Sequence, residues 1–246
     1  MSNVASQGVL TRGKRDFEIF NDFPNFATGT DGWSSLAADA SATVAVNDAR
    51  RGIITLTTGA TDNNECDVRT TTELFLMLAG KPCWCEFLAQ YAEANTDDAN
   101  ICFGFSDLIA ANMLIDDGGG VVASMDGALI YKLDGGTVWR CHSSNGATRT
   151  DNITAITAGG TTGGYYGNDD GYHMFRIEIA DYTSTSNQVT FWYDGSQLRD
   201  STTNLPIVHT VLVASATEME VGAYVKAGGA NSEVVLIDYI GAGQVR

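Results

Sequence analysis

The feature that most constrains the fold of this chain is a two-residue alternation of apolar and polar side chains, repeated in short segments. Residues 83–91 show it most clearly. Such a pattern predicts a strand with one face in the core. Because successive side chains of a strand point to opposite faces, one face would carry Cys83, Cys85, Phe87 and Ala89, and the other Trp84, Glu86, Leu88 and Gln90.

Similar segments, rich in β-branched and aromatic residues, recur along the chain between turn signals. Asp134-Gly135-Gly136 and Asp194-Gly195 are two such signals, since glycine adopts a positive φ without strain. The pattern predicts an all-β fold, an antiparallel two-sheet β-sandwich. Strands are expected at residues 51–58, 83–91, 101–105, 128–133, 137–141, 172–180, 188–193, 207–214, 218–225 and 233–240.

Helix is expected to be sparse. Residues 72–80 and 108–114 each contain a short apolar run, which is compatible with a helical turn or with a buried strand. Residues 145–170 are polar and rich in glycine, and we expect them to form a long surface loop.

The first 26 residues differ from the rest and are expected to form an N-terminal arm and docking segment, ahead of a single β-sandwich domain at residues 27–246. The arm carries the chain's one dense cluster of positive charge, Arg12, Lys14 and Arg15. Pro24 and its polar neighbours disfavour a long helix over residues 16–26. We therefore expect an irregular segment whose rings dock on the sandwich: Phe17, Phe20, Phe23 and Phe26.

The formal net charge of −16 argues against nucleic acid as the main partner, because phosphate contacts require a basic footprint. No apolar run approaches the ~18 residues of a membrane-spanning helix, and no apolar signal segment opens the sequence. We therefore expect neither a membrane partner nor export. The odd number of cysteines, five, indicates reduced thiols and assembly in a cytoplasm.

The C-terminal third carries the most specific patterns. They read Tyr172-His-Met-Phe-Arg-Ile-Glu-Ile, Val189-Thr-Phe-Trp-Tyr-Asp-Gly195 and Glu233-Val-Val-Leu-Ile-Asp-Tyr-Ile240, preceded by Ile101-Cys-Phe-Gly-Phe-Ser106. These segments resemble strands of the concanavalin A-like, laminin-G-like jelly-roll family. The resemblance extends over residues 83–243 and implies the jelly-roll fold. It leaves function open, because this fold hosts lectins, glucanases and structural modules.

Within that family the chain is similar in overall texture to the head decoration, or cement, proteins of tailed phages, which are acidic, rich in Gly, Thr and Ala, and carry a short arm. The resemblance implies a structural virion protein and not an enzyme, located on the capsid surface and assembled in the host cytoplasm. Its partners would be the major capsid protein and neighbouring copies of itself, in a dimer or trimer. The capsid-binding residues would be Arg12, Lys14, Arg15, Phe17 and Phe20.

A carbohydrate-binding, lectin-like module is the alternative function. A sugar site would use an aromatic platform beside polar loop residues, and Trp139, Tyr165 and Tyr166 are the candidates. The remaining tryptophans, Trp33, Trp84 and Trp192, are expected to pack in or near the core.

A degenerate glucanase-like hydrolase is the second alternative. Glycosidases need two carboxylates held ~5–10 Å apart, and Glu65 and Asp67 would share one strand face. The resemblance puts Thr70 where glucanases of this fold carry their last glutamate, and Glu218 with Glu220 lacks a third member as well. The chain has three histidines and no Gly-x-Ser-x-Gly motif, so no catalytic residue is expected.

No cofactor and no metal site are expected, with structural calcium left open. Cys83 and Cys85 would lie on one strand face and could not surround a zinc ion, so we interpret the cysteines as small buried apolar residues. Calcium prefers clustered loop oxygens. Acidic or amide side chains in predicted loops are Asp97, Asp98, Asp116, Asp117, Asn168, Asp169 and Asp170, at spacings that match no EF-hand.

Overall fold

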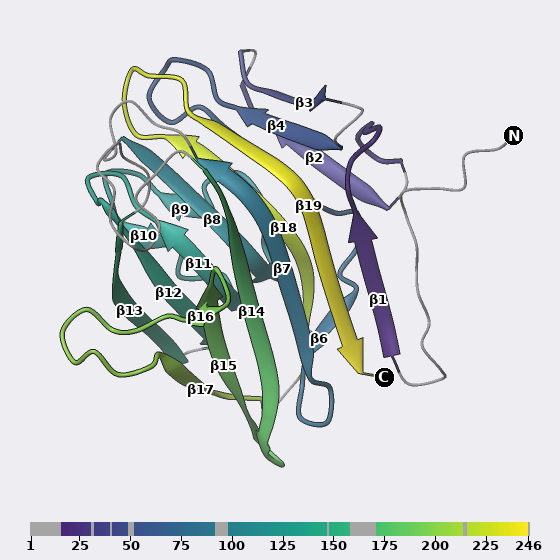
Figure 1. Ribbon diagram of the computed structural model, residues 1–246, viewed down its shortest axis with the longest axis vertical. Coiled ribbons are helices and arrows are strands. Elements are labelled where there is room, and N and C mark those ends of the chain that lie inside the picture. Colours follow the sequence, from purple (N-terminus) through teal and green to yellow (C-terminus); the bar gives the residue numbers. More distant parts are fainter. Residues whose placement is uncertain are drawn as a thin grey trace, which may run out of the picture.

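The computed structural model describes residues 16–30, 32–39, 41–48, 52–91, 98–146, 148–157, 171–213 and 216–245. Over these residues the protein consists of strands and turns, arranged as two large antiparallel sheets (Figure 1). The predicted all-β sandwich is confirmed. No helix in this part of the chain is long and apolar enough to span a membrane.

The first sheet has nine strands within the described ranges. Their order is β16-β15-β14-β7-β19-β4-β3, with β1 beside β19 and β17 beside β15. The strands are β1 (Asp16–Asn21), β3 (Thr43–Asp48), β4 (Ile53–Thr57), β7 (Cys83–Tyr91), β14 (Tyr172–Thr183), β15 (Ser186–Tyr193), β16 (Ser196–Gln197), β17 (Val208–Leu212) and β19 (Val234–Val245).

The second sheet has eight strands in the same ranges, ordered β13-β12-β11-β8-β18-β5-β2, with β6 beside β18. A separate hairpin joins β9 (Leu114–Ile115) and β10 (Gly120–Val121). Residues 72–80 contain strand β6, so the strand alternative holds there. The strands are β2 (Trp33–Ala37), β5 (Glu65–Thr70), β6 (Phe75–Met77), β8 (Ala99–Ser106), β11 (Gly127–Lys132), β12 (Val138–Asn145), β13 (Thr148–Thr157) and β18 (Thr217–Ala227).

Alternating side chains of both sheets form the main core. The ring centroids of Phe103 and Phe175, from opposite sheets, lie 4.4 Å apart, and those of Trp139 and Phe175 lie 4.9 Å apart. In β7 every second residue is buried, as the sequence predicted. All five cysteines are buried and free, and burial raises the pKa of the Cys66 thiol to about 12. They fill space as small apolar residues.

Residues 107–126, the strap, connect β8 to β11 and cover the outer face of the second sheet. Apolar strap residues, among them Ile109, Met113 and Leu114, pack against Tyr131 and Tyr224 of the sheet in a second apolar cluster. No comparable apolar layer covers the outer face of the first sheet in the described ranges. The two sheets therefore differ in which outer surface they offer to solvent.

The segment that follows the arm is part of the sandwich. Residues 16–21 form strand β1, which pairs with β19, so the expectation of an irregular segment is wrong here. Phe17 is only 8% exposed and its ring lies 5.8 Å from that of Phe75. Phe23 is fully buried against Trp33. The rings do dock on the sandwich, but through a regular strand that alternates inward and outward side chains.

Candidate functional site

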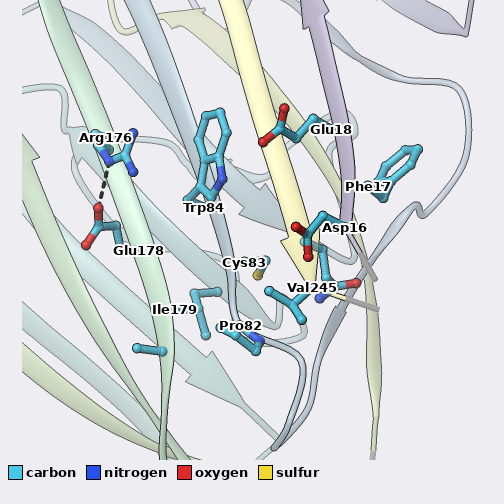
Figure 2. Close-up of a pocket in the computed structure, with 12 residues that line it drawn as sticks. Asp16, Phe17, Glu18, Pro82, Cys83, Trp84, Arg176, Glu178, Ile179 and Val245 are labelled. Atoms are coloured by element: carbon cyan, nitrogen blue, oxygen red, sulfur yellow. Dashed lines mark hydrogen bonds and ion pairs between the residues drawn. The ribbon is translucent and has the colours of Figure 1, made fainter. Parts of the chain in front are cut away.

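A groove of about 300 Å³ lies on the outer face of the first sheet, across β14, β7, β19 and β1 (Figure 2). We call it the Trp84 groove and define it by Asp16, Glu18, Trp84, Arg176, Glu178 and Val245. Trp84 stands between the two charged walls, with the side chains of β14 on one side and those of β1 on the other. Its side chain is half-buried.

The register of four neighbouring strands builds the groove. Glu18 of β1 lies opposite Gly243 of β19, Gly243 lies opposite Trp84, and Trp84 lies opposite Glu178 of β14. Because Gly243 has no side chain, the Trp84 indole can lie over strand β19 and close to Glu18. A Cβ atom on Gly243 would lie 2.8 Å from the Trp84 Nε1 atom and 3.1 Å from the Glu18 Cγ atom. Glycine at this position therefore sets where the indole lies in the groove.

Charged side chains hold one wall of the groove in place. The Arg176 guanidinium lies 4.9 Å from the centre of the Trp84 ring, a cation–π contact. It also donates to Glu178 at 2.8 Å and to Glu86 at 3.1 Å. Partial burial opposes the charge on Arg176, but the hydrogen bonds to both carboxylates raise its pKa above the ordinary value. The positive charge of this wall is thus already matched.

The acidic side chains of the opposite wall lack partners among the described residues. The carboxylates of Asp16 and Glu18 form no hydrogen bond or ion pair with any described residue, and the Trp84 indole N–H has no partner there either. Carboxylates accept hydrogen bonds and an indole N–H donates one. The groove thus combines an apolar ring, a free donor and free acceptors, which suits a ligand that has both apolar faces and hydroxyl groups.

The structure places the predicted sugar-binding residues elsewhere. Trp139 is 2% exposed and packs between the sheets, so it cannot be a surface platform. Tyr165 and Tyr166 lie outside the described residues. Trp84, which we expected in or near the core, lies on the open face of the first sheet. The alternation of β7 contained the signal, because it put Trp84 on the face opposite Cys83 and Cys85.

The predicted capsid-binding residues differ in where they lie. Arg12, Lys14 and Arg15 lie outside the described residues. Phe17 is in the core and cannot serve as an anchor for a partner. Phe20 is 45% exposed and its ring lies 5.3 Å from that of Tyr239.

The acidic strand β5 lies beneath the strap. Glu65 and Asp67 share a face of the strand as predicted, but Glu65 is 4% exposed and Asp67 is fully buried. The Glu65 carboxylate accepts the backbone N–H of Asn112 at 2.8 Å and the Tyr224 hydroxyl. Asp67 accepts a hydrogen bond from Arg69. Both carboxylates thus accept hydrogen bonds within the fold, and the second oxygen of Asp67 is buried without a partner among the described residues.

A third carboxylate joins this group from strand β18. The Arg69 Nε atom lies 3.4 Å from a Glu220 oxygen, although the two residues are far apart in sequence. Burial raises the pKa of Glu220 to about 7 and that of Asp67 to about 6. Sequence reasoning missed this contact, because it depends on the pairing of β5 with β18.

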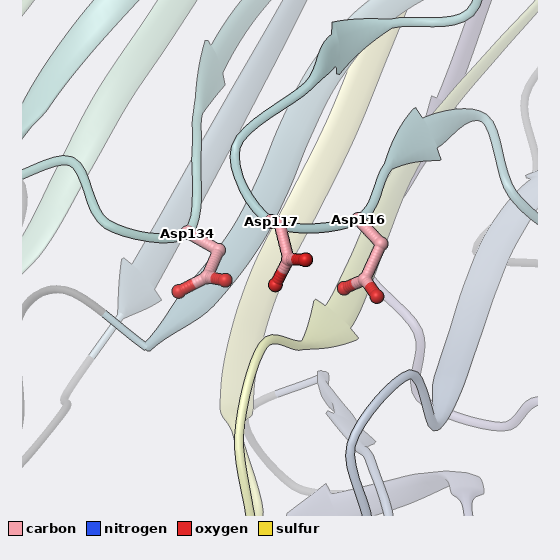
Figure 3. Close-up of side chains that lie close together, drawn as sticks. All are labelled: Asp116, Asp117 and Asp134. Atoms are coloured by element: carbon pink, nitrogen blue, oxygen red, sulfur yellow. The ribbon is translucent and has the colours of Figure 1, made fainter.

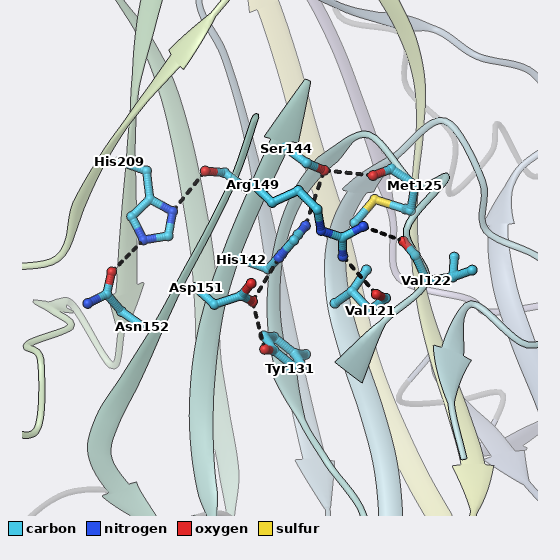
Figure 4. Close-up of polar contacts among 11 residues, drawn as sticks. Val121, Val122, Met125, Tyr131, His142, Ser144, Arg149, Asp151, Asn152 and His209 are labelled. Atoms are coloured by element: carbon cyan, nitrogen blue, oxygen red, sulfur yellow. Dashed lines mark hydrogen bonds and ion pairs between the residues drawn. The ribbon is translucent and has the colours of Figure 1, made fainter. Parts of the chain in front are cut away.

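Ser144, His142 and Asp151 form a row that looks like a catalytic triad (Figure 4). The His142 Nδ1 atom lies 2.8 Å from Asp151, and its Nε2 atom lies 3.1 Å from the Ser144 hydroxyl. That hydroxyl donates to the backbone carbonyl of Met125 at 2.7 Å, and both His142 and Ser144 are fully buried. The serine proton is therefore directed away from the base, and the row ties the strap to β12.

His209 is the second buried histidine of this region. Its Nδ1 atom lies 2.8 Å from the Ser143 hydroxyl and its Nε2 atom 3.0 Å from the Asn152 side-chain oxygen. Figure 4 shows the imidazole beside Asn152. Burial lowers the pKa of His209 to about 4, with His142 adding to the effect. The neutral imidazole joins β17 to β12 and β13.

Two turns bring three aspartates together (Figure 3). Oxygen atoms of Asp116, Asp117 and Asp134 all lie within 4.8 Å of one another. Asn63 donates to Asp116 at 2.8 Å, and partial burial raises the pKa of Asp134. Oxygen ligands of this kind suit calcium, so structural calcium, which the sequence left open and for which Asp116 and Asp117 were candidates, stays open. The other predicted loop residues lie apart from this cluster or outside the described ranges: Asp97, Asp98, Asn168, Asp169 and Asp170.

No protein-family model and no curated protein matches the sequence. Solved structures match the fold over nearly the whole chain. The carbohydrate recognition domain of Emp47p has a TM-score of 0.55 at 12% identity, covering 90% of this chain and 92% of that one. An endo-1,3-β-glucanase from Streptomyces sioyaensis has a TM-score of 0.58 at 11% identity, covering 99% and 98%.

An endo-β-1,4-glucuronan lyase from the fungus Trichoderma reesei is also similar, with a TM-score of 0.53 at 12% identity and coverage of 91% and 94%. At such identities the similarity shows the fold alone. None of these neighbours links the chain to phage decoration proteins. The chain has the concanavalin A-like jelly-roll sandwich, a fold found in a carbohydrate recognition domain and in polysaccharide-cleaving enzymes alike.

Proposed function

We propose that the protein is a non-catalytic carbohydrate-binding module and that the Trp84 groove is its binding site. The observation that carries the proposal is the indole N–H of Trp84 next to two carboxylates, none of which has a partner among the described residues, on a sheet face that no apolar layer covers in the same ranges. Sugars offer C–H faces to an aromatic ring and hydroxyl groups to polar neighbours. The carbohydrate recognition domain among the structures of similar fold supports this proposal.

The burial of the carboxylates on strand β5 favours binding without hydrolysis. Hydrolysis needs two carboxylates that reach the glycosidic bond. Glu65 and Asp67 are instead buried under the strap and engaged by Asn112, Tyr224 and Arg69. A polysaccharide would have to displace the apolar contacts of the strap before it could reach them.

The test is a glycan array at high protein concentration, followed by calorimetric titration of the glycans that bind. Trp84→Ala should weaken binding at least about tenfold, in keeping with the loss of an aromatic anchor. Trp192→Ala is the matched control, because Trp192 is also half-buried on the outer face of the first sheet but its indole N–H already donates to Thr190. Circular dichroism would verify that both variants fold.

Two results would overturn the proposal. One is the absence of any glycan binding at millimolar concentration. The other is equal loss of binding in the Trp84→Ala and Trp192→Ala variants, since this would place the site outside the groove or trace the loss to a general disturbance of the sheet.

A further inference from the structure

We infer that the Trp84 groove selects glycans that carry free amino groups, such as glucosamine oligomers, over neutral and acidic glycans. This inference rests on the proposed function and names its ligand class. It starts from the charges that line the groove: among the described residues, the three carboxylates of Asp16, Glu18 and Glu178 face a single guanidinium, that of Arg176.

The positive charge in the groove, on Arg176, is already paired with carboxylates. Arg176 donates to Glu178 and, just outside the groove, to Glu86. An incoming carboxylate would have to compete with both partners for the guanidinium and would face further carboxylates around it. Like charges brought together in this way are strongly unfavourable, so uronate-rich glycans should be rejected.

The negative charge, by contrast, lacks partners in the described part of the chain. The carboxylates of Asp16 and Glu18 form no ion pair or hydrogen bond there. A neutral sugar that covered them would remove water without supplying a counter-charge, which costs free energy. A hydroxyl group can donate a charge-assisted hydrogen bond to a carboxylate, but an ammonium group adds the Coulomb attraction of an opposite charge.

The spacing on β1 suits an oligomer. Asp16 and Glu18 are two residues apart on one strand face and therefore ~7 Å apart along the strand, while Glu178 stands on the other wall. Gly243 allows the Trp84 ring to lie close to Glu18. A sugar ring against Trp84 would thus place its amino group near the acidic wall, and a neighbouring unit could reach the second carboxylate.

The test is calorimetric titration of the full chain with three hexamers: glucosamine, N-acetylglucosamine and galacturonate. We expect the glucosamine hexamer to bind at least about tenfold more tightly than the N-acetylated one, and its affinity to fall as salt is raised from about 0.05 to 0.5 M. The double variant Asp16→Asn/Glu18→Gln should remove this preference. The control Glu73→Gln/Glu218→Gln removes two exposed carboxylates outside the groove and should keep it.

The outcomes separate this inference from the proposed function. Equal affinity for the neutral and the amino hexamer, still lost in Trp84→Ala, would refute amine selection and leave carbohydrate binding intact. A lysine hexapeptide that bound as tightly as the glucosamine hexamer, with no effect of Trp84→Ala, would show mere charge attraction and also refute it. Binding of no hexamer and no array glycan would remove the proposed function itself.

Discussion

Acidification should destabilise the protein through His209. The imidazole is 2% exposed and is neutral in the fold, held by Ser143 and Asn152. Burial lowers its pKa from 6.5 to about 4. Between these two values the unfolded chain binds a proton that the folded protein does not bind, so acid favours unfolding. The stabilising contribution is complete above pH 6.5 and is lost as the pH falls from there towards 4.

The size of the effect follows from the two pKa values. Each pKa unit corresponds to about 1.4 kcal/mol, so the step from 6.5 to about 4 amounts to about 3 kcal/mol when complete. At about pH 5 the loss should reach about 2 kcal/mol relative to pH 8. Asp67 and Glu220 act in the opposite direction, because their raised pKa values make the folded state bind protons more readily than the unfolded chain.

Comparison with the His209→Gln variant isolates the contribution of His209 to the pH dependence of the free energy of unfolding. Glutamine can donate to Asn152 and accept from Ser143 but does not titrate. Urea unfolding of both proteins at about pH 8 and pH 5 gives two differences in the free energy of unfolding, which should differ by about 2 kcal/mol. The contributions of Asp67 and Glu220 cancel in this comparison. A value below about 0.5 kcal/mol would refute the argument that a buried neutral imidazole links the strands.

Three further changes test the site, the core and the arm. Gly243→Ala should reduce glycan affinity at least about tenfold by displacing the Trp84 indole, whereas Gly241→Ala, whose Cβ would meet Trp84 at an ordinary 3.5 Å, should not; titration checks both. Trp139→Ala should cost about 3–5 kcal/mol in urea unfolding. A deletion of residues 2–15 that keeps strand β1 should leave the melting temperature unchanged. If the protein decorates phage heads, the same deletion should abolish binding to expanded heads. Full binding by the shortened protein would refute the decoration hypothesis.

Much of the fold could be predicted from local pattern alone. A two-residue period assigns side chains to the faces of a strand without reference to any other part of the chain, which is why β7 and the five buried cysteines agree with expectation. The same period does not say which face of a strand packs against the other sheet. It also does not say which of the two sheets has its outer face covered by the strap. Trp139 and Trp84 both lie on strands, yet one is in the core and the other borders the groove.

The sequence by itself therefore determined an acidic antiparallel sandwich with buried thiols. Only the tertiary structure decided where ligands can reach it. The Trp84 indole lies over strand β19 because β19 brings Gly243 against β7, and Glu220 meets Arg69 because β18 pairs with β5. Both contacts join residues about 150 positions apart, and their register depends on the whole sheet. The strap then closes one outer face with apolar contacts and leaves the other open.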